Sequence, residues 1–394
     1  MRRTSHAKSP LLVATCFVFV VLISFVMLQG VTRPAEANTA ALAPTYVYVG
    51  SSLNHNWGIN YDGYVTGFAV AADGSAQVIS GSPFKGPSYN LVSIGDYLFG
   101  DDGRDIVTYT RAANGSLKAT SMVNDLALIT DPGDQFIYAL NPDRSGQTFN
   151  SVVSCGSCNS EILTWAIGAD GKLTYVEDPA PSSSFAKWNG IFAFSPDDRF
   201  AYTVPWLSGL ADFQREGNGT LRQLSNGGPG VASPPSPPSP DDGICVPGNM
   251  AVSGTGYIVL SWWGSEYGCN NDGYLLGTYT ENPDGTLALV TSVGLMPAVY
   301  ENSMAFDPTG AYLALAGTAS CQSKGGCGAV QIYKLESDGT LATLGPAQLV
   351  PGNSFASVLW DNAGHVHVLT GCCSGAGGNP AGQGLYVYNF DGRI

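Results

Sequence analysis

The stretch NSMAFDPTGAYLALAG (residues 302–317), followed after a loop by AVQIYKLESDGTLATLG (residues 329–345), decides the fold. It holds four short runs rich in aliphatic, β-branched and aromatic residues: Ser303–Phe306, Tyr312–Ala316, Ala329–Leu335 and Leu341–Leu344. In the turn Asp307-Pro308-Thr309-Gly310, Pro presets φ and Gly accepts a positive φ. Asp338-Gly339 predicts a type I′ hairpin turn, which needs positive φ at both residues. The stretch therefore predicts one antiparallel meander of four strands.

Copies of this unit extend along the whole chain. An Asp-Gly or Asn-Gly pair recurs every 41 to 66 residues, with its glycine at 74, 115, 171, 219, 285, 339 and 392. One meander cannot bury its own faces, so the copies must pack against each other. The spacing predicts an all-β fold, a seven-bladed β-propeller of four-stranded antiparallel meanders in a single domain spanning residues 38–394.

The two end blades are expected to be incomplete. The chain stops two residues after Gly392, so the seventh blade lacks a fourth strand, and the first blade lacks its first. Either residues 38–44 fill a gap, or the ring closes imperfectly.

A propeller of this kind has two unlike faces. The turns between first and second strands and the Asp/Asn-Gly turns lie on one, which we call the tight-turn face. The other, the loop face, is predicted to carry Ser51–Asp62, Asn141–Ser160, Ser261–Asp272, Thr318–Gly328, Gly371–Gly384 and the proline-rich link Gly227–Pro247. Because functional residues concentrate on loops around a rigid scaffold, the site is expected on the loop face, around the channel mouth.

Residues 1–37 predict a signal peptide or an N-terminal membrane anchor. Three basic residues precede an apolar run from Leu11 to Leu28, and Ala35-Glu36-Ala37 offers a cleavage site. The run is long for a signal peptide and just long enough to span a bilayer. We expect an exported protein that is periplasmic, extracellular or anchored, with membrane contact only through this segment.

The composition and net charge of the chain limit the classes of binding partner that can be expected. The chain is 44% hydrophobic and 12% charged, with 50 Gly and 24 Pro, which favours a turn-rich β protein. Its formal net charge of −14 would become −17 without residues 1–37, which carry four basic residues and one acidic residue. An acidic surface repels phosphate backbones, so no nucleic-acid partner is expected. A monomer that binds a small molecule or a glycan on the loop face is predicted.

Eight of the nine cysteines follow the leader, and an even number in an exported protein predicts disulfides. The blade register places all eight on the loop face. It pairs Cys155 with Cys158, Cys321 with Cys327, and Cys245 with Cys269. The adjacent Cys372 and Cys373 form a vicinal disulfide, pair elsewhere or stay reduced.

The candidate catalytic residues are His55 in the first blade's long loop and the run Asp101, Asp102, Arg104 and Asp105. The run links two strands of the second blade near the channel mouth. Aspartates close to a glycine suit calcium, which is the cofactor candidate, although the run lacks the ligand spacing of a known calcium loop. A solvated turn with an internal ion pair is the alternative. His365 and His367 point to one side of a strand, which suits packing as well as metal ligation, and the metal remains unknown.

Candidate ligand-binding residues are acids and tryptophans mapped to the loop face. The tryptophans follow second strands and could stack on sugar rings, or pack between blades instead. The candidates are Glu161, Trp206, Trp262, Trp263, Glu266 and Glu301.

Several phrases resemble the lactonase-type seven-bladed propeller family, which includes propeller 6-phosphogluconolactonases and related muconate-cyclising enzymes. They are SGSPF at Ser80–Phe84, FSPDDRFAYTV at Phe194–Val204, FDPTGAYLALAG at Phe306–Gly317, and the recurring DGTL. The resemblance covers roughly residues 45–394, and it implies the fold more strongly than the chemistry.

The resemblance also implies where catalytic residues would stand. Enzymes of this family tend to carry a His near the position of Gly190 and an Asp-Arg pair near Leu210-Ala211, and neither is kept here. A phosphosugar would also need an Arg or Lys cluster, which the loop face lacks in sequence. Two hypotheses follow: a ligand- or glycan-binding propeller without the family's catalytic residues, or an exported lactone hydrolase that acts at the channel mouth.

Overall fold

The opening stretch folds as the sequence predicts. In the computed structural model, β23 (Tyr300–Phe306), β24 (Tyr312–Ala319), β25 (Cys327–Leu335) and β26 (Leu341–Thr343) form one antiparallel sheet, and β27 (Gln348–Val350) also pairs with β25. Both faces of this sheet are covered. Leu313 and Leu315 pack toward the preceding sheet, whereas Ala314 and Ala316 pack toward the following one. All four side chains are therefore fully buried.

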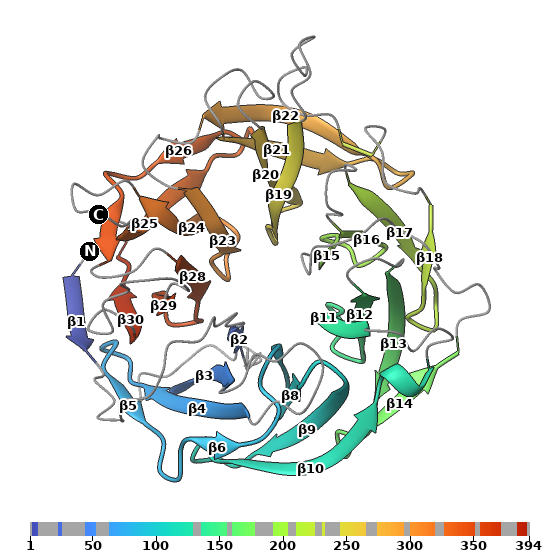
Figure 1. Ribbon diagram of the computed structural model, residues 1–394. Coiled ribbons are helices and arrows are strands. Elements are labelled where there is room, and N and C mark those ends of the chain that lie inside the picture. The colour runs from blue at the N-terminus through green and yellow to red at the C-terminus, as the bar shows by residue number, and fades with distance from the viewer. Residues whose placement is uncertain are drawn as a thin grey trace, which may run out of the picture.

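Six more sheets complete a ring of seven blades, which confirms the predicted fold (Figure 1). Blade one contains β2 (Ile23–Phe25), β3 (Thr45–Ser52), β4 (Gly63–Val70) and β5 (Ala76–Val78), with β6 (Phe84–Lys85) paired to β4. Blade two contains β7 (Leu91–Ile94), β8 (Tyr97–Asp101), β9 (Asp105–Arg111) and β10 (Leu117–Asn124). Blade three contains β11 (Gln135–Pro142), β12 (Thr148–Cys155), β13 (Glu161–Ile167) and β14 (Leu173–Val176).

The remaining blades follow the same order. Blade four contains β15 (Phe192–Phe194), β16 (Phe200–Thr203), β17 (Ala211–Arg215) and β18 (Leu221–Gln223). Blade five contains β19 (Cys245–Val252), β20 (Tyr257–Gly264), β21 (Tyr274–Glu281) and β22 (Leu287–Gly294), and blade six is the sheet β23–β26. Blade seven contains β28 (Phe355–Trp360), β29 (His365–Gly371), β30 (Gly384–Asn389) and β1 (Arg2–His6).

The structure describes residues 2–6, 23–25, 44–52, 63–128, 135–155, 160–177, 192–203, 210–224, 231–232, 245–264, 274–294, 300–319, 327–350, 355–371 and 384–391. Within them the single helix is the 3₁₀ turn η1 (Leu126–Leu128), and no helix is long and apolar enough to cross a membrane.

The strands that complete the end blades come from the N-terminal segment. β1 pairs with β30 as the fourth strand of blade seven, and β2 pairs with β3 as the first strand of blade one. The sequence had suggested residues 38–44 for this role, and residues 38–43 lie outside the described ranges. Cleavage after Ala37, which stays a prediction, would remove both pairings.

The prediction for blade three was wrong in its register. Asn141–Ser160 was assigned to a loop, but it contains the strand β12. Asn150 and Ser151 disguised the strand, because buried polar side chains break the apolar pattern by which a strand is recognised. Asn150 Nδ2 donates to Thr164 Oγ1 at 2.8 Å, so the amide nitrogen is paired inside the sheet.

The Asp/Asn-Gly turns lie between third and fourth strands, as predicted, but their geometry is not type I′. Gly339 has φ of 86°, whereas Asp198 is the only non-glycine residue with positive φ in the described part of the chain. Gly339 N donates to Glu336 O at 3.0 Å, and Glu336 N donates to Thr340 O at 2.8 Å. This is a type I turn followed by a left-handed glycine, a longer hairpin connection than the two-residue one.

Neighbouring blades are joined by one recurring contact on the tight-turn face. In three blades a tyrosine at or next to the start of the second strand reaches the Asp/Asn-Gly turn of the next blade. Tyr46, Tyr97 and Tyr257 donate their hydroxyls to the carbonyls of Ala113, Ala169 and Ser337, at 2.6, 2.7 and 3.0 Å. Each acceptor is the residue just before the Asp or Asn of its turn. We call this interaction the blade clasp.

Two glycines in one turn of blade four provide a test of this geometry. A Cβ on Gly219 (φ 91°) would lie 2.8 Å from Thr148 Cγ2 of blade three, whereas a Cβ on Gly217 would meet nothing within 4 Å. We expect Gly219→Ala to lower the free energy of unfolding by about 1–3 kcal/mol, because alanine is strained at positive φ. Gly217→Ala should raise it by about 0.4–1 kcal/mol through the less flexible unfolded chain. Urea unfolding of both variants checks this, and equal effects would contradict it.

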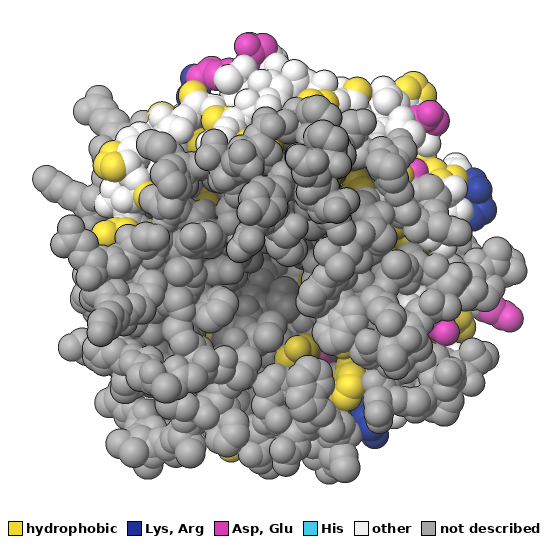
Figure 2. Space-filling model, turned by 45° about the horizontal axis from the view of Figure 1, so that its top comes forward, with side chains coloured by type: hydrophobic (Ala, Val, Ile, Leu, Met, Phe, Trp, Pro, Cys, Tyr) yellow, Lys and Arg dark blue, Asp and Glu magenta, His cyan; other side chains and the backbone are white. Residues whose placement is uncertain are grey.

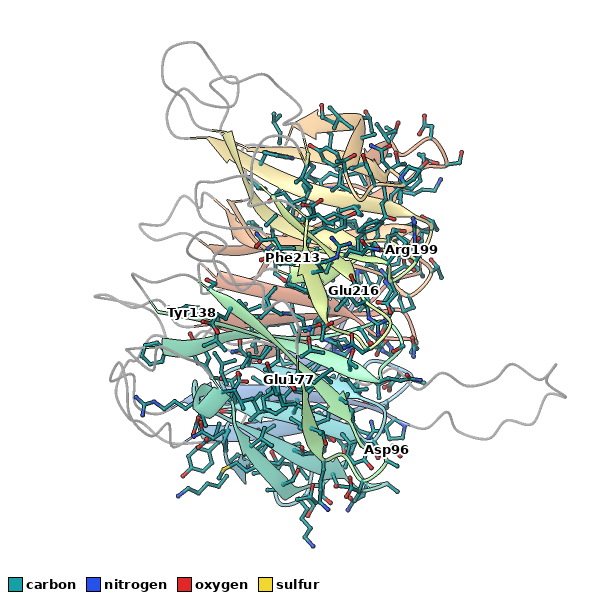
Figure 3. All side chains as sticks on the ribbon, turned by 90° about the vertical axis from the view of Figure 1, so that its right-hand side faces the viewer. Asp96, Tyr138, Glu177, Arg199, Phe213 and Glu216 are labelled. Atoms are coloured by element: carbon teal, nitrogen blue, oxygen red, sulfur yellow. The ribbon has the colours of Figure 1, made fainter. Side chains whose placement is uncertain are left out.

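The side view separates the two faces. Asp96, Arg199 and Glu216, which stand at tight turns of blades two and four, lie on one side of the ring, and Tyr138 points to the other side (Figure 3). The connections between second and third strands, such as the one from β8 to β9, run on the side opposite the tight turns. The predicted division into a tight-turn face and a loop face is therefore what the described strands form.

Candidate functional site

Figure 2 looks onto the loop face, and most of the surface in this view lies outside the described residues. Among the connections between second and third strands, the structure describes the run from Asp101 to Asp105, between β8 and β9, throughout. Ile137 N of blade three donates to Gly103 O at 2.9 Å. Because β11 is the innermost strand of blade three, this bond holds the acidic run beside the channel mouth.

Two acids of the run, Asp101 and Asp102, accept hydrogen bonds from backbone N–H groups of the turn itself. Asp101 is fully buried, and burial raises the pKa of its carboxyl well above the ordinary value. The carboxyl oxygens accept N–H groups from Gly103 at 2.8 Å and from Asn90 at 3.2 Å. Asp102 Oδ1 accepts the N–H groups of Arg104 and Asp105 at 3.0 and 2.8 Å. These bonds form a tight turn, so Asp101 is a structural residue of this turn rather than an acid presented to a ligand.

Asp105 is placed differently from these two acids. It is the first residue of β9, it is half-buried, and it lies opposite Asn124 in the sheet. Burial of its carboxyl, with the negative charge of Asp102 nearby, raises its pKa. A half-buried carboxyl with a raised pKa at the loop-face end of a strand is a candidate for binding or acid–base chemistry.

Glu161 has the same place one blade further on. It is the first residue of β13 and is half-buried, as Asp105 is in β9. The structure thus gives two neighbouring blades an acid at the loop-face end of their third strands. In blade four the equivalent residue is Ala211, which is fully buried.

Trp262 does not line the rim. Its side chain is 2% exposed and packs between blades four and five with Tyr202, Leu210 and Tyr279. Its ring centroid lies 6.4 Å from that of Tyr279. The prediction that Trp262 forms a sugar-stacking platform is therefore wrong, because the side chain belongs to the core.

The other candidates are described only in part. Trp263 and Glu301 lie in β20 and β23, without described side chains. Cys155, Cys245 and Cys327 stand at the loop-face ends of β12, β19 and β25, where their blades were expected to place them. The candidates outside the described residues are His55, Cys158, Trp206, Glu266, Cys269, Cys321, Cys372 and Cys373. The disulfide pairs stay predictions.

The structure also reveals a buried acid that sequence reasoning missed. Asp125, just after β10, is fully buried between blades two and three. Ser151 Oγ donates to Asp125 Oδ1 at 3.1 Å and accepts from Trp165 Nε1 at 3.1 Å. Burial raises the pKa of Asp125 to about 7. The only sign of this residue in the sequence is an Asp next to an outer strand. An Asp at such a place is equally expected in an exposed turn, so the sequence does not reveal that it is buried.

His365 and His367 have a third partner that the sequence did not suggest. Asp361 Oδ2 lies 2.7 Å from His365 Nδ1 and 3.0 Å from His367 Nε2, and all three residues are buried. These are hydrogen-bond distances to one carboxylate oxygen. Asp361 Oδ1 accepts the N–H groups of Ala363 and His365, at 2.9 and 2.8 Å, as the turn residue of its blade.

No protein-family model and no curated protein matches this sequence. Among solved structures, the chain is similar to the periplasmic gluconolactonase PpgL of Pseudomonas aeruginosa, with 19% identity and a TM-score of 0.54. That match covers 77% of this chain and 85% of the other. It is also similar to a 6-phosphogluconolactonase candidate from Bacteroides uniformis, with 17% identity, a TM-score of 0.50, and 77% and 82% of the two chains covered. A further candidate, from Bacteroides fragilis, has 15% identity, a TM-score of 0.50, and coverage of 77% and 81%.

Identity at this level carries the fold and not the chemistry. Together with the seven four-stranded blades, these likenesses give the chain the fold of the lactonase-type seven-bladed β-propellers.

Proposed function

We propose that this protein is an exported lactonase-like propeller that binds a small-molecule or glycan ligand at the channel mouth of its loop face. The observation that carries the proposal is the pair of acids, Asp105 and Glu161, at equivalent ends of neighbouring third strands. Export is supported by the pattern of residues 1–37, and the similar gluconolactonase PpgL is itself periplasmic.

The ligand should be neutral and rich in hydroxyl groups. Carboxylates accept hydrogen bonds from hydroxyls, and such charge-assisted bonds are stronger than neutral ones. An anionic phosphosugar would meet repulsion, because the chain carries a formal net charge of −14. A sugar, a sugar lactone or an uncharged glycan fits this chemistry.

A second function, hydrolysis of a sugar lactone, has one observation in its favour. The raised pKa of Asp105 suits a general base that activates water, or an acid that protonates a leaving oxygen. Hydrolysis needs this proton transfer, whereas binding does not. Measuring both turnover and affinity on the same variants therefore separates the two functions.

Asp105→Asn should weaken binding of D-glucono-δ-lactone or of a neutral glycan by about tenfold or more, because it removes a charge-assisted hydrogen bond. The matched control is Asp96→Asn, an exposed acid on the tight-turn face that pairs with Arg111 at 3.0 Å. That variant should bind like the unmodified protein. Calorimetric titration of the full chain gives the affinities, a glycan array extends the ligand set, and a pH-stat assay gives lactone turnover.

The outcomes separate the two functions. Saturable binding without turnover, weakened only by Asp105→Asn, supports the binding propeller. Lactone turnover by the unmodified protein that falls at least a hundredfold in Asp105→Asn supports the hydrolase instead of the binding propeller. The absence of both binding and turnover for every sugar, lactone and glycan probe would refute the proposal.

A further inference from the structure

The seam between blade seven and blade one is where the ring closes, and its clasp differs from the others. His365, the first residue of β29, occupies the position held by Tyr46, Tyr97 and Tyr257 in other blades. His365 Nε2 lies 3.2 Å from Ala72 O. Ala72 precedes Asp73-Gly74 just as Ala113 precedes Asn114-Gly115, so the imidazole replaces a tyrosine hydroxyl in an otherwise identical contact.

Both nitrogens of His365 face oxygen atoms that can only accept. Ala72 O is a backbone carbonyl, and Asp361 Oδ2, at 2.7 Å from Nδ1, belongs to a carboxylate. A neutral imidazole has one N–H, so it would turn a lone pair toward one of these oxygens. The imidazolium has two N–H groups and satisfies both. A tyrosine at this position makes the same clasp with a hydroxyl that titrates far above neutral pH.

The acceptors and negative charges around His365 raise its pKa and outweigh its burial, which lowers it. Asp361, at the turn after β28, is fully buried, and hydrogen bonds from the two histidines lower the pKa of its carboxyl despite its burial. Burial lowers the pKa of His367 on β29, so this ring is neutral and donates from Nε2. Across the seam, Asp73 of blade one carries a negative charge, and Asn389 of β30 donates to its carbonyl at 3.0 Å.

We propose that His365 is a protonation-dependent latch at the seam between the last and first blades, closed by the imidazolium and loosened when the ring loses its proton. The hydrogen bond to Asp361 raises the pKa of His365 above its ordinary value of 6.5. A raised pKa in the closed seam means that the stabilisation is complete below pH 6.5 and is lost as pH rises through the higher value. No residue at the equivalent position of the other second strands titrates near neutral pH, so this sensitivity is confined to the seam. Those residues are Tyr46, Tyr97, Thr148, Phe200, Tyr257 and Tyr312.

Hydrogen–deuterium exchange of the full chain between pH 6 and pH 9 tests the latch. Two turns with matching hydrogen bonds serve as reporter and control: Ala71–Ser75, held by His365, and Glu336–Thr340, held by Tyr257. After correction for intrinsic rates, the opening constant of Ala71–Ser75 should rise above pH 6.5. The rise can reach tenfold per pH unit, because one proton is released on opening. The opening constant of Glu336–Thr340 should stay constant.

A variant and a titration complete the test. His365→Tyr copies the clasp of the other blades and should make the two turns behave alike at every pH. Should this variant fail to fold, an NMR titration of the unmodified protein still decides, since the His365 ring must titrate above pH 6.5. The latch would be overturned by equal pH dependence of the two turns, or by titration of the His365 ring below pH 6.5. Loss of protection on adding EDTA would also overturn it, because a metal ion and not a proton would then hold the seam.

Discussion

Replacing Trp262 by alanine should lower the free energy of unfolding by about 3–5 kcal/mol, the usual cost of removing a buried tryptophan. The side chain is 2% exposed and lies in the cluster between blades four and five, where Tyr202 and Leu210 contact it from the neighbouring blade. Truncation would leave a cavity that two rigid sheets cannot close. Trp262→Phe should cost less, because it keeps most of the apolar contact.

Equilibrium urea unfolding measures this effect, and Leu289→Ala provides the control. Leu289 lies on the outer strand β22 and is 39% exposed, so its truncation should change stability by no more than about 0.5 kcal/mol. Affinity for sugars should change little in Trp262→Phe at temperatures where it is folded. If Trp262→Ala kept its stability but lost glycan binding, the prediction would be contradicted, and Trp262 would be a ligand-binding residue of the rim.

Trp262 also illustrates what a propeller sequence reveals and what it hides. The positions of the turns could be predicted because their chemistry is local: Asp, Pro and Gly favour turns wherever they stand. The type I′ conformation predicted for the Asp/Asn-Gly turns was wrong. The blade number followed from counting those turns. A blade, however, is covered on both faces, so the alternation of β20 does not distinguish a core tryptophan from a rim tryptophan. That distinction depends on Tyr202 and Leu210, which come from another blade.

The clasp at the seam could have been anticipated in part. Aligning the turn after Asp361 with the turn after Asp307 brings His365 to the place of Tyr312. In blade six, Tyr312 N donates to Asp307 Oδ1 at 2.7 Å, and in blade seven His365 N donates to Asp361 Oδ1 at 2.8 Å. The partner Ala72 could not be found this way, because it lies at the other end of the chain and only ring closure brings it near.

Asparagine at position 125 should stabilise the protein at alkaline pH. Burial raises the pKa of the Asp125 carboxyl from 3.8 to about 7, so the native state resists its ionisation. A raised folded-state pKa means that stability is complete below the ordinary value and falls as pH rises toward 7. The fall amounts to about 4 kcal/mol, at about 1.4 kcal/mol for each pH unit between the two values.

Asp125→Asn removes this cost because the amide stays neutral while its carbonyl oxygen can still accept from Ser151. The difference in unfolding free energy between the variant and the unmodified protein should therefore be near zero at pH 4 and grow to about 4 kcal/mol above pH 7. Both proteins carry His365, so its pH-dependent contribution to the unfolding free energy cancels when the two proteins are compared. Asp96→Asn, an exposed acid, should show no such trend. If Asp125→Asn were less stable than the unmodified protein at pH 8, the prediction would be wrong. Either the buried carboxylate is stabilising, or the amide N–H groups, placed where Asp125 Oδ2 has no hydrogen-bond partner, cost more than the ionised carboxyl.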